Sequence, residues 1–311
     1  MIETTALEKL SWNGRIPTTE EFAVHIPDDW IEHCPNIFLH DESIAPEVLQ
    51  SESNQLFLKK VTQWTKKHLN KLERSPGFII FKVKTHLVDD QQLKSLYYFI
   101  TKGFGELNNR YGELFEVKDR KLDYTKEAIP VSKTKASTGF HTDSTAMKYN
   151  PYIVGLLCLY PSKTGGISKL ANASDLYKWM QKNHPDGVET LKEKIIRDVI
   201  TPGQDTDKKA ILKNRFPVFS LHQDSFQFRY MRYWIITGHE RTHTRIAPEL
   251  ITALDNIDEY FNSAANVLDY RLDRGDILLM NNHFICHNRT AYEDSPEDNT
   301  QRIMIRTWIN K

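Results

Sequence analysis

The stretch STGFHTDST, residues 137–145, places a histidine and an aspartate two positions apart. Residues two apart in a β-strand face the same side, so His141 and Asp143 would offer an imidazole and a carboxylate to one ligand. Both groups bind divalent transition metals. The pair therefore predicts part of a metal site, which needs at least one further ligand. Taken alone, the pair is better explained as two hydrogen-bonded side chains at a strand edge.

The segment GDILLMNNHFICHNRTAYED, residues 275–294, offers two candidates for that third ligand. His283 and His287 follow a short apolar strand and a polar turn, and they are four residues apart. Both would face the same side of a strand, so periodicity cannot choose between them. Either one could instead be a hydrogen-bonded histidine of the core, because the chain has 12 histidines.

The last predicted strand, RIMIRTWI, carries two arginines among apolar residues. Arg302, Met304, Arg306 and Trp308 would share one face of it. Guanidinium groups in such surroundings usually meet an anion, because their fork of donors matches a carboxylate. This face predicts a site for an acidic ligand, although ion pairs with a carboxylate such as Asp276 would also explain it.

Strands dominate the second half of the chain, and helices lie before and among them. This order favours a β-sandwich or barrel with helical cover over a sheet in which strands and helices alternate. Helices are predicted over residues 51–73, 89–112, 174–184 (capped by Ser174) and 247–266; strands are predicted over 77–83 and 152–161, twice within 217–236, and four times between 267 and 309.

The composition excludes several functional classes. Lys and Arg number 41 and Asp and Glu also 41, so no net field attracts nucleic acid or anionic lipid. The three cysteines, Cys34, Cys158 and Cys286, are widely spaced, which argues against a disulfide framework or a zinc knuckle. No signal peptide is apparent, and no run approaches the ~18 apolar residues of a membrane helix. We expect a cytoplasmic protein.

The motifs in order, HxD, GG-x-[ST], GD…NN…HxR and R-x3-R, resemble the taurine dioxygenase and clavaminate synthase-like family of iron(II)/2-oxoglutarate-dependent oxygenases. The resemblance covers residues 77–309, the oxygenase core of a single catalytic domain spanning 1–311, and residues 1–75 form a helical lead-in. It implies a mainly β fold with flanking helices: a double-stranded β-helix, or jelly roll, with ligands inside its open mouth.

The resemblance assigns His141, Asp143 and His287 as the ligands of Fe(2+), and the HxR context selects His287 over His283. Two imidazoles and one carboxylate leave three positions of an octahedral iron for 2-oxoglutarate and O2. The intact Asp143 disfavours the halogenating relatives, which lack this carboxylate. Two departures from the family pattern are Asn281-Asn282, where Asp-Asn is usual, and Asn288 in place of a common glycine.

Roles for further residues also follow from the resemblance. Arg302 would pair with the distal carboxylate of 2-oxoglutarate. Ser168, in GGIS, would bond the same carboxylate, or it caps the turn after Gly166. Arg306 matches a position that often binds a substrate carboxylate. Apart from the resemblance, the segment SFQFRYMRYW supplies Arg229 and Arg232. Either would line the substrate pocket, although a surface ion pair explains each equally well.

One motif points to a different class of enzyme. Residues 238–243, GHERTH, contain His239-Glu240-x-x-His243, the HExxH pattern of zinc peptidases, which requires a helix. The motif follows an apparent strand, and Pro248 comes five residues after it, which leaves little room for a helix. We expect a loop near the barrel mouth, with Glu240 contacting a cationic part of the substrate.

The implied function is hydroxylation of a C–H bond in a free amino acid or an amino-acid-derived small metabolite. Desaturation, cyclisation, and action on a sulfonate or another small acid would use the same residues. The partner expected is this small-molecule substrate, with no nucleic acid and no membrane; oligomeric state stays open. The alternatives from other classes are a zinc hydrolase using His239 and His243, and a non-catalytic jelly-roll binding module.

Overall fold

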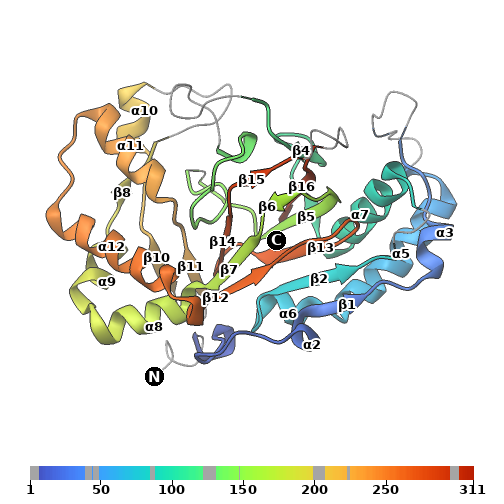
Figure 1. Ribbon diagram of the computed structural model, residues 1–311, viewed down its shortest axis with the longest axis horizontal. Helices are drawn as coiled ribbons and strands as arrows, with labels where there is room; N and C mark the ends of the chain where they lie inside the picture. The colour runs from blue at the N-terminus through green and yellow to red at the C-terminus, as the bar shows by residue number, and fades with distance from the viewer. Residues whose placement is uncertain are drawn as a thin grey trace.

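Two β-sheets form the centre of the molecule, and helices flank them on both sides (Figure 1). The computed structural model describes residues 7–38, 44, 49–84, 88–121, 131–146, 148–198, 207–222, 225–294 and 301–311. In spatial order the larger sheet contains β1 (Ala23–His25), β2 (Phe78–Lys82), β13 (Ile277–Asn281), β5 (Ile153–Tyr160), β16 (Ile303–Asn310) and β3 (Glu106–Leu107), and β4 (Phe115–Val117) also pairs with β16.

The smaller sheet places β7 between two strands from the end of the chain. Its order is β12 (Val267–Tyr270), β7 (Ser168–Asn172) and β14 (Ile285–Arg289), all antiparallel. Short pairs complete the β-structure: β6 (Thr164–Gly165) with β15 (Tyr292–Glu293), β8 (Ile195–Ile196) with β9 (Arg215–Phe216), and β10 (Phe219–His222) with β11 (Ser225–Phe228). The two main sheets are the two walls of the predicted jelly roll.

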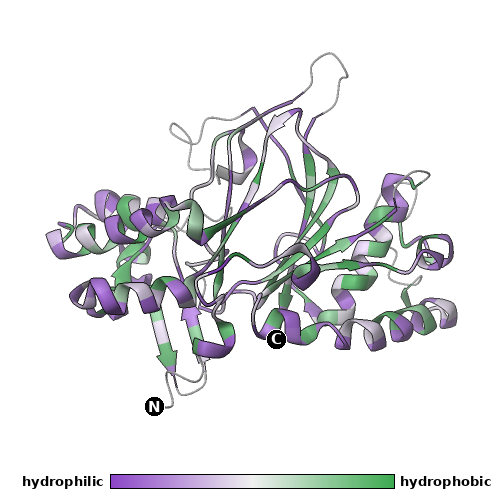
Figure 2. Cartoon of the chain, turned by 60° about the horizontal axis from the view of Figure 1, so that its bottom comes forward, coloured by the Kyte–Doolittle hydropathy of each residue, from purple (hydrophilic) through white to green (hydrophobic). Residues whose placement is uncertain are grey.

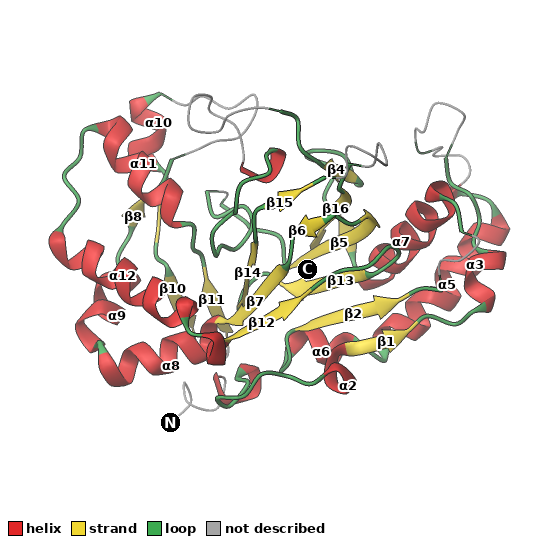
Figure 3. Ribbon diagram, viewed as in Figure 1, coloured by secondary structure: helices red, strands yellow, loops and turns green. Residues whose placement is uncertain are grey.

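The helices fall into two groups on either side of the sheets (Figure 3). The first group is α2 (Thr19–Phe22), α3 (Asp29–His33), α5 (Glu52–Lys66), α6 (Leu69–Glu73) and α7 (Asp90–Phe104). The second group is α8 (Ala173–Asn183), α9 (Pro185–Lys192), α10 (Lys208–Lys213), α11 (Arg232–Thr242) and α12 (Pro248–Asn262). Figure 2 shows bands of hydrophilic and hydrophobic residues alternating along these helices, as expected when one face of each helix is buried.

Alternation along the strands of the larger sheet divides the apolar residues between two cores. On β16, Met304 and Trp308 pack in the core shared with the smaller sheet. Ile305 and Ile309 point to the opposite face and pack in the core beneath α5 and α7. Arg306 lies between Met304 and Trp308 in this period, so it faces the interior between the sheets. The predicted common face of these residues is therefore confirmed.

Three features of the first two-thirds of the chain differ from the sequence prediction: one helix end, one helix cap and the content of the lead-in. Helix α7 ends at Phe104 rather than near Gly112, because Glu106 and Leu107 leave the helix to pair with β16 as β3. Helix α8 is capped by Asn172 rather than Ser174; the Asn172 side chain accepts hydrogen bonds from the backbone N–H groups of Ser174 and Asp175. The lead-in is not wholly helical, since β1 pairs in parallel with β2.

The predicted second strand of segment 217–236 continues only to Phe228, and the residues from Arg232 onward are helix α11. The buried positions on this helix are Ile235, Gly238, His239 and Thr242, spaced as one face of a helix. Aromatic and β-branched residues around Trp234 favour a strand locally, and tertiary packing overrides that preference. The HExxH motif is thus largely helical, which corrects the predicted loop.

Two further findings bear on the composition. The cysteines Cys34, Cys158 and Cys286 are all free thiols. Among the described helices, none is both long enough and apolar enough to cross a membrane.

Gly77, just before β2, packs against the turn that leads into β14. Replacing Gly77 with alanine is the sharpest test of this packing. Its φ is +83°, and a Cβ there would lie 2.4 Å from the Phe284 ring. Gly112 has a similar φ of +88°, but a Cβ there would meet only the Leu114 carbonyl oxygen at 3.9 Å, an ordinary van der Waals contact. Alanine at either position carries the left-handed strain of about 1–2 kcal/mol, and Gly77→Ala adds roughly 1–3 kcal/mol of overpacking.

Urea unfolding of the two variants measures this difference. We expect Gly77→Ala to be clearly less stable than Gly112→Ala. Equal stabilities would show that Phe284 moves aside without penalty.

Candidate metal centre

The segment that carries His141 pairs directly with β14. The N–H of His141 donates to the carbonyl of His287, and the N–H of His287 donates back, each at 2.9 Å. Residues opposed in this way present their side chains on the same face. The two imidazoles accordingly lie side by side, with ring centroids 4.3 Å apart. Two residues 146 positions apart in the chain, 287 minus 141, are thus held in register by backbone hydrogen bonds.

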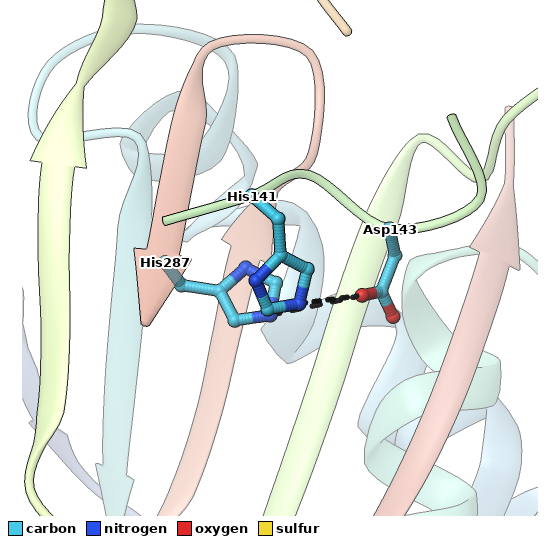
Figure 4. Close-up of side chains that lie close together, drawn as sticks. All are labelled: His141, Asp143 and His287. Atoms are coloured by element: carbon cyan, nitrogen blue, oxygen red, sulfur yellow. Dashed lines mark ion pairs between the residues drawn. The ribbon is translucent and has the colours of Figure 1, made fainter. Parts of the chain in front are cut away.

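Asp143 completes a cluster of three side chains (Figure 4). Its Oδ1 lies 3.5 Å from Nε2 of His141 and 3.7 Å from Nε2 of His287. One ligand atom from each residue falls within 4.8 Å of the others. Over the described ranges no other group of three His, Cys, Asp or Glu side chains is arranged to hold a metal. The structure therefore brings together the three residues that the sequence predicted as ligands.

Asn282 fixes the backbone of Asp143. Its Oδ1 accepts the Asp143 N–H at 2.7 Å, and its Nδ2 donates to the carbonyls of Asp143 at 3.1 Å and Pro151 at 3.0 Å. Its own N–H donates to the carbonyl of Tyr152. The side chain is fully buried. The amide of Asn282 thus ties the turn that carries Asp143 to the turn that follows β13.

The protonation states suit metal binding. Nδ1 of His141 lies 2.9 Å from the carbonyl of Gly139, which can only accept, so Nδ1 is the donor in this contact and Nε2 is the ring nitrogen that faces Asp143. Burial, with His141 beside it, lowers the pKa of His287 to about 3, so this imidazole is neutral at pH 7. Burial alone would raise the pKa of Asp143, but Arg306 and the two histidines outweigh it and the net shift is downward.

Two residues of β16 orient the Asp143 carboxylate. The indole N–H of Trp308 donates to Oδ2 at 2.6 Å, and Nη1 of Arg306 donates to the same oxygen at 3.4 Å. Oδ1 remains on the side of the histidines. The guanidinium of Arg306 stacks between the rings of Phe115 and Trp308, at 5.1 and 4.7 Å. Sequence reasoning assigned no part in the site to Trp308, although its place on the Arg306 face was visible.

His283, the rival ligand, lies elsewhere. It belongs to the turn between β13 and β14, and its ring packs edge-on against Tyr152. Burial lowers its pKa to about 4, and Lys311 and Arg229 add to that shift. The parity argument treated both histidines as strand residues, and so it could not distinguish them. Only His287 lies in the strand.

A second cluster of polar side chains lies at the end of the smaller sheet. Arg302 is buried, and its guanidinium lies 5.2 Å from the Tyr292 ring, while that of Arg289 lies 4.8 Å from the same ring. Ser168 is the strand partner of Arg289. In the described part of the chain no carboxylate forms an ion pair with Arg302, and burial lowers its pKa. Sequence reasoning used Arg289 only as part of the HxR motif and assigned no role to Tyr292.

Arg232 and Glu240, the other predicted substrate residues, both lie on α11. Arg232 forms ion pairs with Asp258 at 2.6 Å and Asp255 at 2.7 Å, which join α11 to α12. Glu240 is exposed on the same helix. The geometry gives Arg232 a structural contact, and contact with a substrate stays a prediction for both residues.

The HExxH motif does not assemble a zinc site in this structure. His239 is buried, and its Nδ1 lies 2.8 Å from the carbonyl of Ile235. His243 caps the end of α11 in a left-handed conformation, with φ +54°. The spacing that places both histidines on one helical face therefore ends before His243.

Asn282→Asp and Asn288→Asp form a matched pair that tests the tie to Asp143. Asn282 uses its amide N–H groups, which aspartate lacks, whereas Asn288 accepts hydrogen bonds from Ser137 and Thr138 through Oδ1. We expect Asn282→Asp to weaken Fe(II) binding roughly 10–100-fold and to destabilise the fold by about 1–3 kcal/mol. Asn288→Asp should change neither property much.

Anaerobic iron titration and urea unfolding measure the two effects separately. If Asn282→Asp loses stability but binds iron as tightly as the wild type, then Asn282 supports the fold without positioning Asp143.

Comparisons with known proteins agree with this architecture. Residues 41–308 match the family described as taurine catabolism dioxygenase TauD, TfdA family. FR-33289 synthase of Streptomyces rubellomurinus is 26% identical over 181 residues, 57% of this chain and 51% of that protein. Gamma-butyrobetaine dioxygenase of Homo sapiens is 24% identical over 188 residues, 60% of this chain and 47% of that protein. The chain thus spans about half the length of these curated relatives.

The fold matches a solved structure over nearly its full length. Asparagine oxygenase in complex with Fe(II), (2S,3S)-3-hydroxyasparagine and succinate superposes with a TM-score of 0.69 at 14% identity, covering 93% of each chain. This likeness confirms the predicted jelly-roll fold. The match to the family over 41–308 establishes the relationship itself: the chain belongs to the taurine catabolism dioxygenase TauD, TfdA family.

Proposed function

We propose that the protein is an iron(II)- and 2-oxoglutarate-dependent oxygenase that hydroxylates a C–H bond of a small, amino-acid-like substrate. The observation that carries this proposal is the convergence of His141, Asp143 and His287, whose ligand atoms lie within 4.8 Å of one another. The solved relative with Fe(II), a hydroxylated amino acid and succinate supports both the chemistry and the substrate class.

The three side chains fit iron(II). Two imidazoles and one carboxylate on one side of a metal are the donor set of non-haem iron oxygenases, and they leave positions open for other ligands. Asp143 is ionised, and its Oδ2 is already bonded to Trp308 and Arg306, so Oδ1 is the oxygen available beside the histidines. Iron(II) with 2-oxoglutarate and O2 supplies the oxidation, in which 2-oxoglutarate becomes succinate and CO2 and the substrate gains a hydroxyl group.

Arg302 is the residue we assign to the distal carboxylate of 2-oxoglutarate. It is a buried cation without an ion pair among the described carboxylates, and such a group requires an anion. The Tyr292 ring beside it holds the guanidinium plane. Ser168 stands at the same end of the smaller sheet, where its hydroxyl would add a donor.

Arg306 is the residue we assign to the substrate carboxylate. Its guanidinium is held between Phe115 and Trp308 and lines a small pocket with Asn108 and Tyr111. Because it also contacts Asp143, an acidic group bound to Arg306 would lie close to the metal. A carboxylate or a sulfonate would satisfy this site equally, and desaturation or cyclisation would use the same residues. We propose a cytoplasmic location, which the three free thiols support.

Substitution of the ligands tests the reaction class. His141→Ala or Asp143→Ala should abolish iron binding and 2-oxoglutarate-dependent succinate formation, because two ligands rarely hold iron(II). His243→Ala is the matched control, since this exposed histidine belongs to the HExxH motif. Iron content and succinate measured together distinguish the alternatives. Turnover that survives His141→Ala but is lost in His243→Ala would favour the hydrolase-like motif, and iron binding without any succinate would favour a binding module.

Arg302, just before β16, and Arg306, within β16, should differ in the kinetic constants that their substitution changes. Arg302→Gln removes charged hydrogen bonds of about 1.5–3 kcal/mol, so it should raise the 2-oxoglutarate concentration needed for half-maximal rate roughly 10–150-fold. Arg306→Gln should leave that value nearly unchanged and raise the KM for substrate. Steady-state succinate formation measures both. If Arg302→Gln binds 2-oxoglutarate normally, our assignment of Arg302 is wrong even if the reaction class is right.

A further inference from the structure

A cavity of about 310 Å³ lies apart from the candidate metal ligands. Its walls come from residues 9–10, the end of α6, the start of β5, strand β11, the turn between β13 and β14, and the residue after β16. Its volume falls at the lower end of the roughly 300–1,000 Å³ of small-molecule pockets. It shares no lining residue with the small pocket beside Arg306. The cavity therefore has the size of a ligand site and no part in the chemistry assigned so far.

The turn between β13 and β14 separates this cavity from the candidate metal centre. Asn281 and His283 line the cavity, and the Asn281 amide donates to the carbonyl of Leu72 in α6 at 3.0 Å. Asn282, between them, points the other way and accepts the N–H of Asp143 at 2.7 Å. Alternate residues of one turn thus face two different sites, so a molecule in the cavity would lie behind the metal ligands rather than among them.

Tyr152 contacts three other residues of the cavity wall. The His283 ring packs edge-on against it with centroids 5.2 Å apart, Nζ of Lys311 lies 5.0 Å from its ring centroid, and its hydroxyl donates to Oε1 of Glu73 at 3.5 Å. Burial, with Glu73 beside it, raises the pKa of Tyr152 to about 12, so the phenol keeps its proton at pH 7. His283 is neutral there because burial lowers its pKa to about 4. Neither ring contributes charge, and the charge of the cavity comes from its flexible side chains.

Those side chains are mostly cationic. Lys9, Arg74 and Lys311 line the cavity, and Glu73 is the only carboxylate side chain among the lining residues. Over the ranges that the structure describes, no carboxylate side chain forms an ion pair with any of the three cations. A concave surface lined by one sign of charge concentrates ligands of the opposite sign, and ammonium and guanidinium groups form their strongest hydrogen bonds with carboxylates and phosphates. The charge of the cavity therefore favours an anion.

We propose that this cavity is a second ligand site, which binds a small organic anion through a carboxylate or a phosphate-type group. The three cations would hold the acidic group, and the apolar lining residues Leu10 and Phe226 would contact the carbon skeleton. The inference does not depend on the proposed function, because it uses no metal ligand and neither of the arginines assigned to 2-oxoglutarate and substrate.

Succinate and inorganic phosphate are the probes, and calorimetry at constant ionic strength measures their binding. The full chain carries Arg302→Gln and Arg306→Gln, which remove the two assigned anion sites. We expect at least one probe to bind, and the tighter one identifies the acidic group. Arg74→Gln or Lys9→Gln should weaken binding roughly tenfold, the loss of one charged hydrogen bond. The matched controls Arg215→Gln and Lys67→Gln change exposed cations outside the cavity and should not. No binding of either probe, or binding that both cavity variants retain, would overturn the proposal.

Glu73→Gln provides a test of opposite sign. It removes the carboxylate that repels an anion and keeps an oxygen acceptor for the Tyr152 hydroxyl, so binding of the probe should tighten roughly two- to fivefold. Glu52→Gln changes the net charge equally at an exposed position of α5 outside the cavity, and it should leave the affinity unchanged. Weaker binding by Glu73→Gln, or equal tightening by Glu52→Gln, would show that the cavity does not hold the anion. Urea unfolding of each variant checks that the fold is retained.

Discussion

The reciprocal backbone hydrogen bonds between His141 and His287 are the interaction on which the candidate site depends. They join a segment outside the main strands to β14, and they set two imidazoles on one face at a ring separation of 4.3 Å. A slip of one residue would turn one histidine to the opposite face and dissolve the cluster. The smaller sheet holds β14 through β7, and Asn282 holds Asp143, so the three ligand residues are fixed by backbone and amide contacts rather than by each other.

The larger sheet contributes through the other end of the same carboxylate. Because β16 alternates between two cores, Arg306 and Trp308 must face inward, and both reach Oδ2 of Asp143. The apolar pattern that builds the fold therefore also orients a candidate metal ligand. Removing the indole N–H would leave Oδ2 with the longer contact to Arg306 alone, and the orientation of the carboxylate would be less restricted.

Sequence reasoning reached the parts of the site that depend on motif order and strand period, and missed those that depend on three-dimensional neighbours. The inward face of Arg302, Met304, Arg306 and Trp308 followed from a period of two. The helix that begins at Arg232 did not, because its local residues favour a strand and only packing against the rest of the fold makes it helical. The tie from Asn282 to Asp143 spans 139 positions, and no local pattern reports it.

The balance of buried charge argues that acidic ligands complete this interior. Four arginines of the described chain are buried, Arg197, Arg229, Arg289 and Arg302, against three buried acids. Of these acids, Asp198 pairs with the partly exposed Arg241, Asp276 pairs with Lys82, and Asp143 faces the histidines. Among the described residues, buried arginines thus outnumber buried acids, although the whole chain has equal numbers of acidic and basic residues. Such an excess lowers stability until anions bind, so ligands that bind only the folded state would stabilise it in proportion to their concentration.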